Sequence, residues 1–221
     1  MTELGRAGPL GILGGTFDPI HHGHLRLAEE ARERLALAAV CLIPAGTPPH
    51  RHPPQADGQH RLAMVRAAVA ANPGLAVDAS EIESQGPSYT VPTLERLRAQ
   101  HGPGRPLVLL LGADAFLGLT TWHRWQDLFT LAHIAVATRP SHVLETTHKA
   151  PALAAEFSQR QTLSAAALAE APAGCIIPFG ITPLDISATA IRAALATGGS
   201  ARYLLPDGVL DYISRNRLYQ P

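Results

Sequence analysis

Short apolar runs alternate with amphipathic stretches along most of this chain, and the alternation strongly constrains its fold. Six runs predict strands: Leu10–Leu13, Val40–Pro44, Leu75–Ala79, Leu107–Leu111, His133–Thr138 and Cys175–Phe179. Each run is apolar on both faces and bounded by glycine, proline or polar residues, as is typical of buried parallel strands. Between them the pattern predicts helices over His24–Leu37, Gln59–Ala71 and Thr90–Gln100, with another after Asp127. This order predicts an α/β fold: a doubly wound (Rossmann-like) parallel sheet flanked by helices.

Two segments interrupt the alternation. Ala45–Gly58 (AGTPPHRHPPQADG) is rich in proline, which predicts a surface loop over one end of the sheet. Ser141–Ala173 is rich in alanine and weakly patterned, which predicts helix and loop at the periphery. The 221 residues contain no internal repeat and no linker long enough to separate two domains, so we expect a single domain over residues 1–221.

Charge and composition exclude several classes of function. Eighteen basic residues balance eighteen acidic ones, so a broad electrostatic attraction to nucleic acid or to a membrane is not expected. Lys149 is the single lysine, which argues against a P-loop or a catalytic lysine. Cys41 and Cys175 lie inside apolar runs and predict free thiols in a reducing compartment. No apolar run approaches the ~18 residues of a membrane span, so we expect a cytoplasmic protein. Whether it forms a homo-oligomer stays open.

The loop after the first strand carries the first chemical motif, Gly14-Gly15-Thr16-Phe17-Asp18-Pro19-Ile20-His21-His22-Gly23-His24. In open α/β sheets, ligands bind beyond the carboxyl ends of the strands. Adjacent glycines allow close approach of a ligand, and a helix start presents free N–H groups to phosphate. Imidazoles at His21 and His24 can donate to phosphate oxygens, and a charged imidazolium would stabilise a transition state that gains negative charge. A zinc site is the alternative, although the H-H-x-H spacing lacks the pattern of H-E-x-x-H.

A second motif follows the last predicted strand, Ile186-Ser187-Ala188-Thr189-Ala190-Ile191-Arg192. Ser187 is a natural N-cap, which places Thr189 and Arg192 in the first turns of a helix. Hydroxyls, free N–H groups and a guanidinium would converge there on an anion. Together with the first loop, this helix start predicts a second clamp on one polyphosphate.

The two motifs together resemble the nucleotidyltransferase superfamily with the signatures H-x-G-H and I-S-x-T-x-I-R. Within it, the chain is most similar to the bacterial nicotinate-nucleotide adenylyltransferases. Further segments that carry the resemblance are Pro48-Pro49-His50-Arg51, Pro87-Ser88-Tyr89-Thr90, Leu111-Gly112-Ala113-Asp114, Thr121-Trp122-His123, Arg139-Pro140, Leu204-Leu205-Pro206 and Tyr212-Ile213. They run in the family's order over almost the whole chain, Ser141–Ala173 excepted.

The resemblance implies the reaction and its ATP side. ATP and nicotinate mononucleotide would give nicotinate adenine dinucleotide and pyrophosphate, with Mg²⁺ entering with ATP, no metal site on the protein and no covalent intermediate. The catalytic residues would be His21 and His24, with His24 stabilising the α-phosphoryl transition state. The ATP-binding residues would be Gly14, Gly15, Thr16, Ser187, Thr189 and Arg192. Catalysis would then come from positioning and charge stabilisation.

The resemblance also places a second substrate site. Its residues would be Asp18, Arg51, Thr90, Asp114, Trp122 and His123. Trp122 could stack on the pyridine ring or equally be a core residue, and Arg51 could close over the phosphate. Asp18 could equally hold the loop by accepting backbone N–H bonds. His123 departs from the aromatic Tyr often found at this position in the family, which puts the ring contact there in doubt.

Three rival functions remain: another adenylyl- or cytidylyltransferase such as the pantetheine-phosphate enzyme, a nucleotide-binding regulator without turnover, and a zinc-dependent hydrolase. The pantetheine-phosphate enzyme lacks the PSYT and TWH segments, and a regulator would be expected to have lost His21, His24 or Arg192. The sequence does not decide how strongly nicotinate is preferred over nicotinamide mononucleotide.

Overall fold

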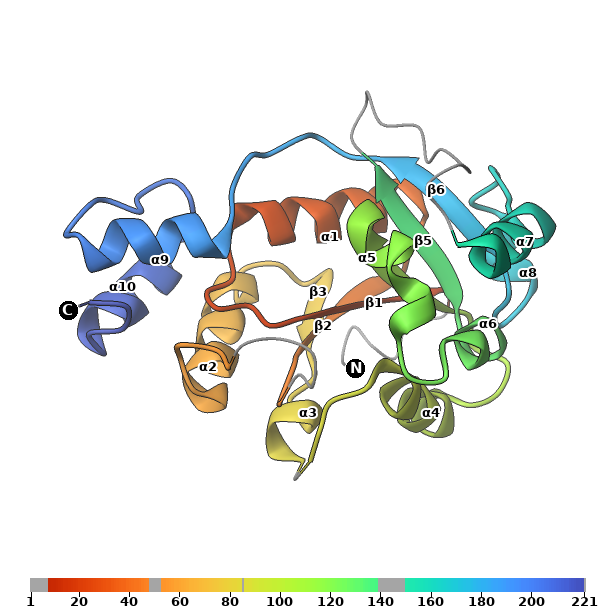
Figure 1. Cartoon of the computed structure of the whole chain (residues 1–221), viewed down its shortest axis with the longest axis horizontal. Helices are drawn as coiled ribbons and strands as arrows, with labels where there is room; N and C mark the ends of the chain where they lie inside the picture. Colours follow the sequence, from red (N-terminus) through yellow and green to blue (C-terminus); the bar gives the residue numbers. More distant parts are fainter. Residues whose placement is uncertain (1–7, 48–52, 85, 139–149, 221) are drawn as a thin grey trace.

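The computed structural model describes residues 8–47, 53–84, 86–138 and 150–220. Its strands are β1 (Leu10–Gly15), β2 (Ala39–Pro44), β3 (Leu75–Val77), β4 (Leu107–Gly112), β5 (His133–Thr138) and β6 (Ile176–Gly180). Its helices are α1 (His22–Arg34), α2 (Gly58–Val69), α3 (Ser80–Glu83), α4 (Thr90–His101), α5 (Ala113–Leu117), α6 (Leu128–Leu131), α7 (Pro151–Arg160), α8 (Ala167–Glu170), α9 (Ala188–Ala196) and α10 (Asp207–Arg215). Two 3₁₀ turns, η2 (Leu119–Thr121) and η3 (Trp125–Asp127), lie between α5 and α6 (Figure 1).

The six strands form one parallel sheet in the order β3-β2-β1-β4-β5-β6. The chain runs outward from β1 to β3, then returns to the other side of β1 at β4. This is the order of a doubly wound Rossmann sheet, and the β1/β4 boundary is the point at which ligands bind in such folds. The predicted fold class is therefore confirmed.

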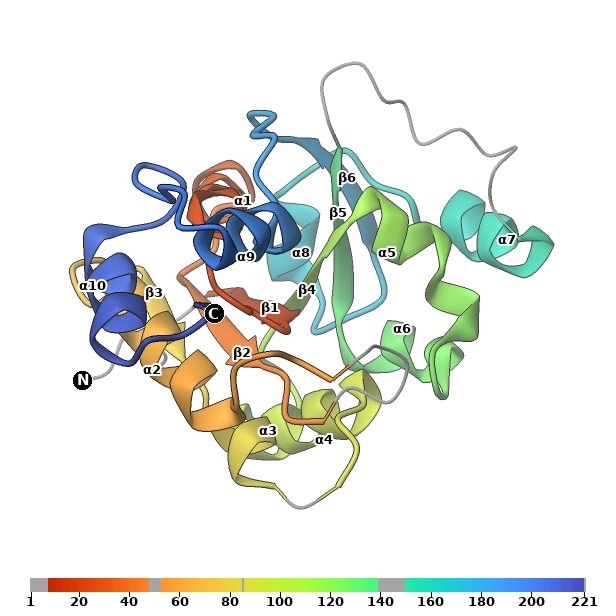
Figure 2. The same ribbon diagram turned by 60° about the vertical axis from the view of Figure 1, so that its left-hand side comes forward.

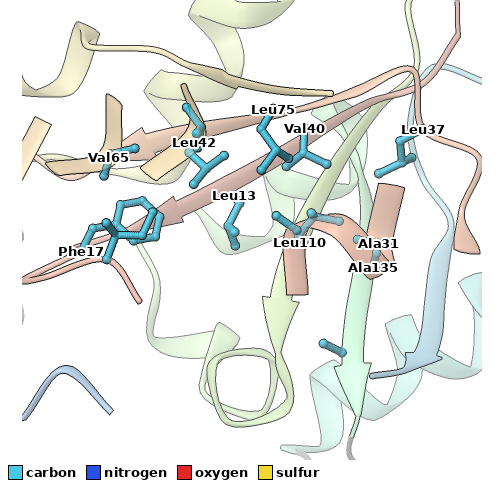
Figure 3. Close-up of a cluster of buried hydrophobic side chains, with 14 of the residues drawn as sticks. Leu13, Phe17, Ala31, Leu37, Val40, Leu42, Val65, Leu75, Leu110 and Ala135 are labelled. Atoms are coloured by element: carbon cyan, nitrogen blue, oxygen red, sulfur yellow. The ribbon is translucent and has the colours of Figure 1, made fainter. Parts of the chain in front are cut away.

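Both faces of the sheet are covered by helices, because alternate residues of each strand point to opposite sides. On β2, Val40 and Leu42 belong to the cluster beneath α1, α2, α9 and α10, part of which Figure 3 shows. Cys41 and Ile43 belong to the opposite cluster, to which α4, α6 and α7 contribute. The strands that are apolar on both faces therefore contribute side chains to two separate cores.

The ends of several elements differ from the prediction by one to three residues. β1 continues through Gly14 and Gly15, which carry no side chain for an apolar pattern to detect. The first helix ends at Arg34 rather than Leu37, because Ala36 adopts φ 50° and the Leu37 N–H returns to the Arg32 carbonyl at 2.9 Å. The left-handed residue at the end of the helix lets the last carbonyls find hydrogen-bond partners. The apolar pattern continues past this point and so does not show where the helix ends.

The peripheral segment Ser141–Ala173 falls partly outside the described residues. Its described part forms α7 and α8, which bury Leu153, Phe157 and Leu168. Both cysteines are free thiols, as expected; Cys41 is buried as well, whereas Cys175 is only half-buried. Among the described residues, no helix combines the length and hydropathy needed to cross a membrane.

Candidate active site

The first motif lies at the carboxyl end of β1, where the chain turns into α1. Phe17 makes the turn with φ 48° and is 2% exposed, so its ring anchors the loop in the core. Gly15 needs to be glycine here, since a Cβ atom would lie 2.8 Å from the Phe17 ring. Gly14 has no atom within 4 Å of a Cβ position and faces open space.

His21 and His24 come together at the start of α1. His21 is the N-cap, and its ring stacks on that of His24 with centroids 3.8 Å apart and planes at 27°. Phe17 meets the His24 ring edge-on at 5.0 Å. The His21 N–H donates to Nδ1 of His24 over 3.4 Å, so a neutral His24 carries its proton on Nε2. That proton is the donor that His24 can offer to an oxyanion.

Both imidazoles are shifted toward their neutral forms. Burial, followed by the charge of His22, lowers the pKa of His21 to about 4. Burial, followed by the charge of His21, lowers the pKa of His24 to about 3. Near neutral pH the resting site therefore offers N–H donors rather than the imidazolium considered from the sequence. The negative charge of a bound polyphosphate opposes both shifts.

His22 does not join this pair. Its side chain lines an open groove of about 410 Å³ between α1 and α2, together with Arg26, Glu29 and Asn72. The three clustered histidines consequently do not converge. Stacked rings also present parallel planes, not nitrogens that point to one tetrahedral centre. In the described ranges, no group of three or more His, Cys, Asp or Glu residues is arranged to hold a metal ion.

Asp18 uses its carboxylate on protein partners. Oδ2 accepts from the Gln55 N–H at 2.8 Å, and Oδ1 accepts from the Ala56 N–H at 3.1 Å and from the Tyr219 hydroxyl at 2.6 Å. The side chain is 5% exposed. Asp18 was considered either as a substrate-binding residue or as a residue that holds the loop. These contacts are those of the second role.

The second motif starts α9 and lies beyond the N-terminal end of α1 (Figure 1). The Ser187 hydroxyl accepts from the Ala190 N–H at 3.1 Å, which is the predicted N-cap. Arg192 donates from one terminal nitrogen to the Asp18 carbonyl at 2.7 Å and lies 3.5 Å from the Thr189 hydroxyl. Two motifs separated by more than 150 residues are thus joined by a direct hydrogen bond. Ser187 and Thr189 remain exposed beside it.

Arg61 on α2 supports the β1–α1 loop, and no sequence pattern singled it out. Its side chain is 2% exposed and donates to the carbonyls of Thr16 at 2.7 Å, Gly46 at 3.1 Å and Ala56 at 3.2 Å. One guanidinium therefore ties the β1–α1 loop to the chain after β2 and to the start of α2.

A cavity of about 180 Å³ opens beside this loop, at the β1/β4 boundary and the end of β2. Its walls include the predicted residues Gly14, Gly15, Thr16, Thr90 and Trp122. The remaining residues of the wall include Glu81, Ser88 and Thr93, none of which was selected from the sequence.

Glu81 organises one wall of the cavity. Its carboxylate accepts a hydrogen bond from the Thr93 hydroxyl at 2.6 Å, and burial raises the pKa of Glu81. The Ser88 hydroxyl accepts from the Gly46 N–H at 2.9 Å, so the segment leading to Thr90 is fastened to the end of β2. The sequence signal that could have indicated this wall is the acidic pair Glu81 and Glu83, a few positions before Pro87-Ser88-Tyr89-Thr90.

The remaining predicted residues are not all brought to the cavity. His123 is exposed beside it and packs on Tyr89, with ring centroids 4.8 Å apart. Asp114 lies exposed in the first turn of α5 and is not part of the cavity wall. Arg51 lies outside the described residues.

Comparison with known proteins agrees with this geometry. Residues 12–194 match the model of the cytidylyltransferase-like family. A "Probable nicotinate-nucleotide adenylyltransferase" of Dechloromonas aromatica (strain RCB) is 56% identical over 96% of this chain and 98% of its own length. A protein of the same name from Acidithiobacillus ferrooxidans is 51% identical over 95% of this chain and 94% of its own length. This chain belongs to the nicotinate-nucleotide adenylyltransferase family.

Solved structures show that this adenylyltransferase has the fold of distant members. The Plasmodium falciparum nicotinic acid mononucleotide adenylyltransferase complexed with NaAD superposes with a TM-score of 0.71, covering 96% of this chain and 97% of that one. The same enzyme complexed with APC gives a TM-score of 0.69. Identity is 16% in each case, so the likeness supports the fold.

Proposed function

We propose that this chain transfers the adenylyl group of ATP to nicotinate mononucleotide, forming nicotinate adenine dinucleotide and pyrophosphate. The observation that carries the proposal is the hydrogen bond between Arg192 and the Asp18 carbonyl, which joins both anion-binding motifs beside one cavity. Family membership supplies the substrate class.

The polyphosphate of ATP would lie across the starts of α1 and α9. Free N–H groups of a helix start favour anions, and Nε2–H of His24 adds a donor. Arg192 adds a positive charge, and its buried Nε has no hydrogen-bond partner within the described residues. Exposed Ser187 and Thr189 flank the same surface. These groups would hold the α-phosphoryl group where negative charge grows in the transition state.

The mononucleotide would occupy the cavity next to Gly14 and Gly15. Trp122 supplies an indole face for the pyridine ring, and Thr90 at the start of α4 supplies main-chain N–H groups for its carboxylate. An oxygen of the mononucleotide phosphate would attack the α-phosphorus of ATP while the bond to the β-phosphate oxygen breaks. Direct transfer of this kind needs no nucleophile from the protein.

Mg²⁺ would neutralise charge on the phosphates of ATP. The donor set fits a metal that is bound through nucleotide and water, because Mg²⁺ keeps several waters and binds substrate phosphates. Arg192 and His24 would share the rest of the charge. We place the reaction in the cytoplasm, where free thiols such as Cys41 persist.

The test is pyrophosphate release from ATP and Mg²⁺, with nicotinate and nicotinamide mononucleotide assayed side by side. We expect release with the acid and much less with the amide. R192Q should lower kcat/KM for ATP by about 10–100-fold, as expected for a lost charge-assisted bond. R202Q, which changes an exposed arginine, is the matched control. No release from folded wild-type protein with either mononucleotide would refute the proposal.

A further inference from the structure

Tyr219 is brought to the site by the turn that follows α10. The Leu218 N–H bonds to the Ile213 carbonyl at 3.1 Å, and the Arg217 N–H bonds to the Ser214 carbonyl at 3.3 Å, with Arg217 at φ 51°. This is the double hydrogen bond of a Schellman ending, which reverses the chain after a helix. The reversal directs Tyr219 toward the β1–α1 loop; Figure 2 shows α10 beside α2 on this side of the molecule.

The side chain of Tyr219 is held by one polar contact. Its hydroxyl donates to Oδ1 of Asp18 at 2.6 Å, and its ring packs against the core beneath α1 and α2. The backbone of Tyr219 has φ 60°, a conformation that L-residues rarely adopt. Burial and then the hydrogen bond to the Asp18 carboxylate raise the pKa of Tyr219 well above its usual range. The hydroxyl therefore remains a donor at every working pH.

Asp18 connects the Tyr219 hydroxyl to the end of the proline-rich loop and to Arg192. Its carboxylate also receives the N–H groups of Gln55 and Ala56, at the end of the proline-rich loop. One terminal nitrogen of Arg192 donates to the Asp18 carbonyl at 2.7 Å and lies 3.8 Å from Oδ2 of the same residue. The guanidinium of Arg192 is therefore held by Asp18 through its carbonyl and through the carboxylate that Tyr219 contacts.

We propose that Tyr219 is a positioning residue of the adenylyl-transfer site: its hydroxyl fixes Asp18, and Asp18 in turn sets the guanidinium of Arg192 for the ATP polyphosphate. The inference rests on the proposed function for its substrate. It adds a residue from a segment that neither signature motif includes, 201 positions from its partner.

Tyr212 provides a matched control on α10 itself. It is also a half-buried tyrosine, and its hydroxyl lies 2.9 Å from Nδ1 of His60 on α2. Y212F removes a hydroxyl bond that holds α10 on α2 without touching Asp18. A merely structural role for Tyr219 would make the two phenylalanine variants behave alike.

The experiment compares wild type, Y219F, Y212F, D18A and the double variant D18A/Y219F, each checked for folding by thermal unfolding. We expect Y219F to raise KM for ATP about tenfold, the size of a lost hydrogen bond to a charged group, while Y212F leaves KM unchanged. D18A removes the acceptor of the Tyr219 hydroxyl, so in that background the Tyr219 substitution should change KM less than about twofold.

Two results would overturn the proposal: a wild-type KM for ATP in Y219F, or an equal loss from Y219F with and without Asp18. The failure of the proposed function has a different signature, namely no pyrophosphate release by wild type. In that event calorimetric titration of the same variants with ATP still decides the role of Tyr219. Weaker ATP binding by Y219F but not Y212F supports it, and equal binding refutes it.

Discussion

The imidazole rings of His21 and His24 stack 3.8 Å apart, while His22 between them lies in a separate groove. The main-chain N–H of His21 occupies Nδ1 of His24, so the proton of a neutral His24 is on Nε2. Of the three histidines, His24 is thus the donor, His21 supports its ring, and the side chain of His22 lies outside the site.

Because His24 lies in the site and His22 outside it, their substitution should change the reaction rate by different amounts. H24N should lower kcat for pyrophosphate release by about 10²–10³, because it removes a donor to the charge that develops in the transition state. H22N changes a neighbouring imidazole that faces the groove and should stay within about threefold of wild type. Steady-state kinetics with ATP and nicotinate mononucleotide checks both variants. Equal losses in H22N and H24N would contradict the assignment of His24.

The same pair predicts how stability depends on pH. An unfolded histidine titrates near pH 6.5, whereas folded His21 and His24 have pKa values of about 4 and about 3. Between these values the unfolded state binds protons that the folded state does not. The stabilisation is therefore complete above pH 6.5 and is lost as pH falls toward 4.

Urea unfolding measured at pH 7.5, 6.0 and 5.0 should show this loss. Each histidine contributes at most about 1.4 kcal/mol per pH unit below 6.5, so a total near 2 kcal/mol at pH 5.0 is a fair expectation after allowing for partial solvation. In H24N the dependence should be shallower over the same range, since asparagine does not titrate. An unchanged slope in H24N would show that His24 is solvated in the folded protein.

Substitution of Arg61 should destabilise the fold, because its guanidinium bonds to protein carbonyls. R61K keeps the charge but cannot reach the carbonyls of Thr16, Gly46 and Ala56 together, so it should cost about 2–4 kcal/mol of unfolding free energy. R66K, on the exposed face of the same helix α2, should stay within about 0.5 kcal/mol of wild type. The midpoints of urea denaturation decide, and a wild-type midpoint in R61K would mean that the loop does not depend on this guanidinium.

Much of this architecture was predictable because local chemistry determines it. Six buried strands show as apolar runs, and their parallel direction follows from the helices between them. The ends of β1 and β6 are followed by the two motifs, and the N-cap at Ser187 is a local signal. The approach of Arg192 to Asp18 follows once both motifs are assigned to one polyphosphate.

Arg61 and Tyr219 were missed for a common physical reason. Each has a hydrogen-bond partner far away in sequence, Thr16 for Arg61 and Asp18 for Tyr219, and nothing in its neighbours distinguishes it from a solvated side chain. Arg61 lies within a predicted helix, where arginine is ordinarily exposed. Its burial depends on carbonyls of a loop 45 positions earlier, which no periodicity encodes.

Alanine substitutions at two glycines beside the cavity should have different effects, one on stability and the other on substrate binding. At Gly46 a Cβ atom would lie 2.1 Å from the Glu81 carbonyl oxygen and 2.9 Å from the Ser88 hydroxyl, so G46A should displace the cavity wall and lower the thermal midpoint by several degrees. At Gly14 the Cβ position is open, so G14A should keep the wild-type midpoint. Its methyl group would instead intrude where we place the nucleotides, raising KM for either substrate about tenfold. Thermal unfolding and steady-state kinetics of G46A and G14A test this difference. A destabilised G14A with normal KM would mean that Gly14 has a structural role and does not lie in the substrate site.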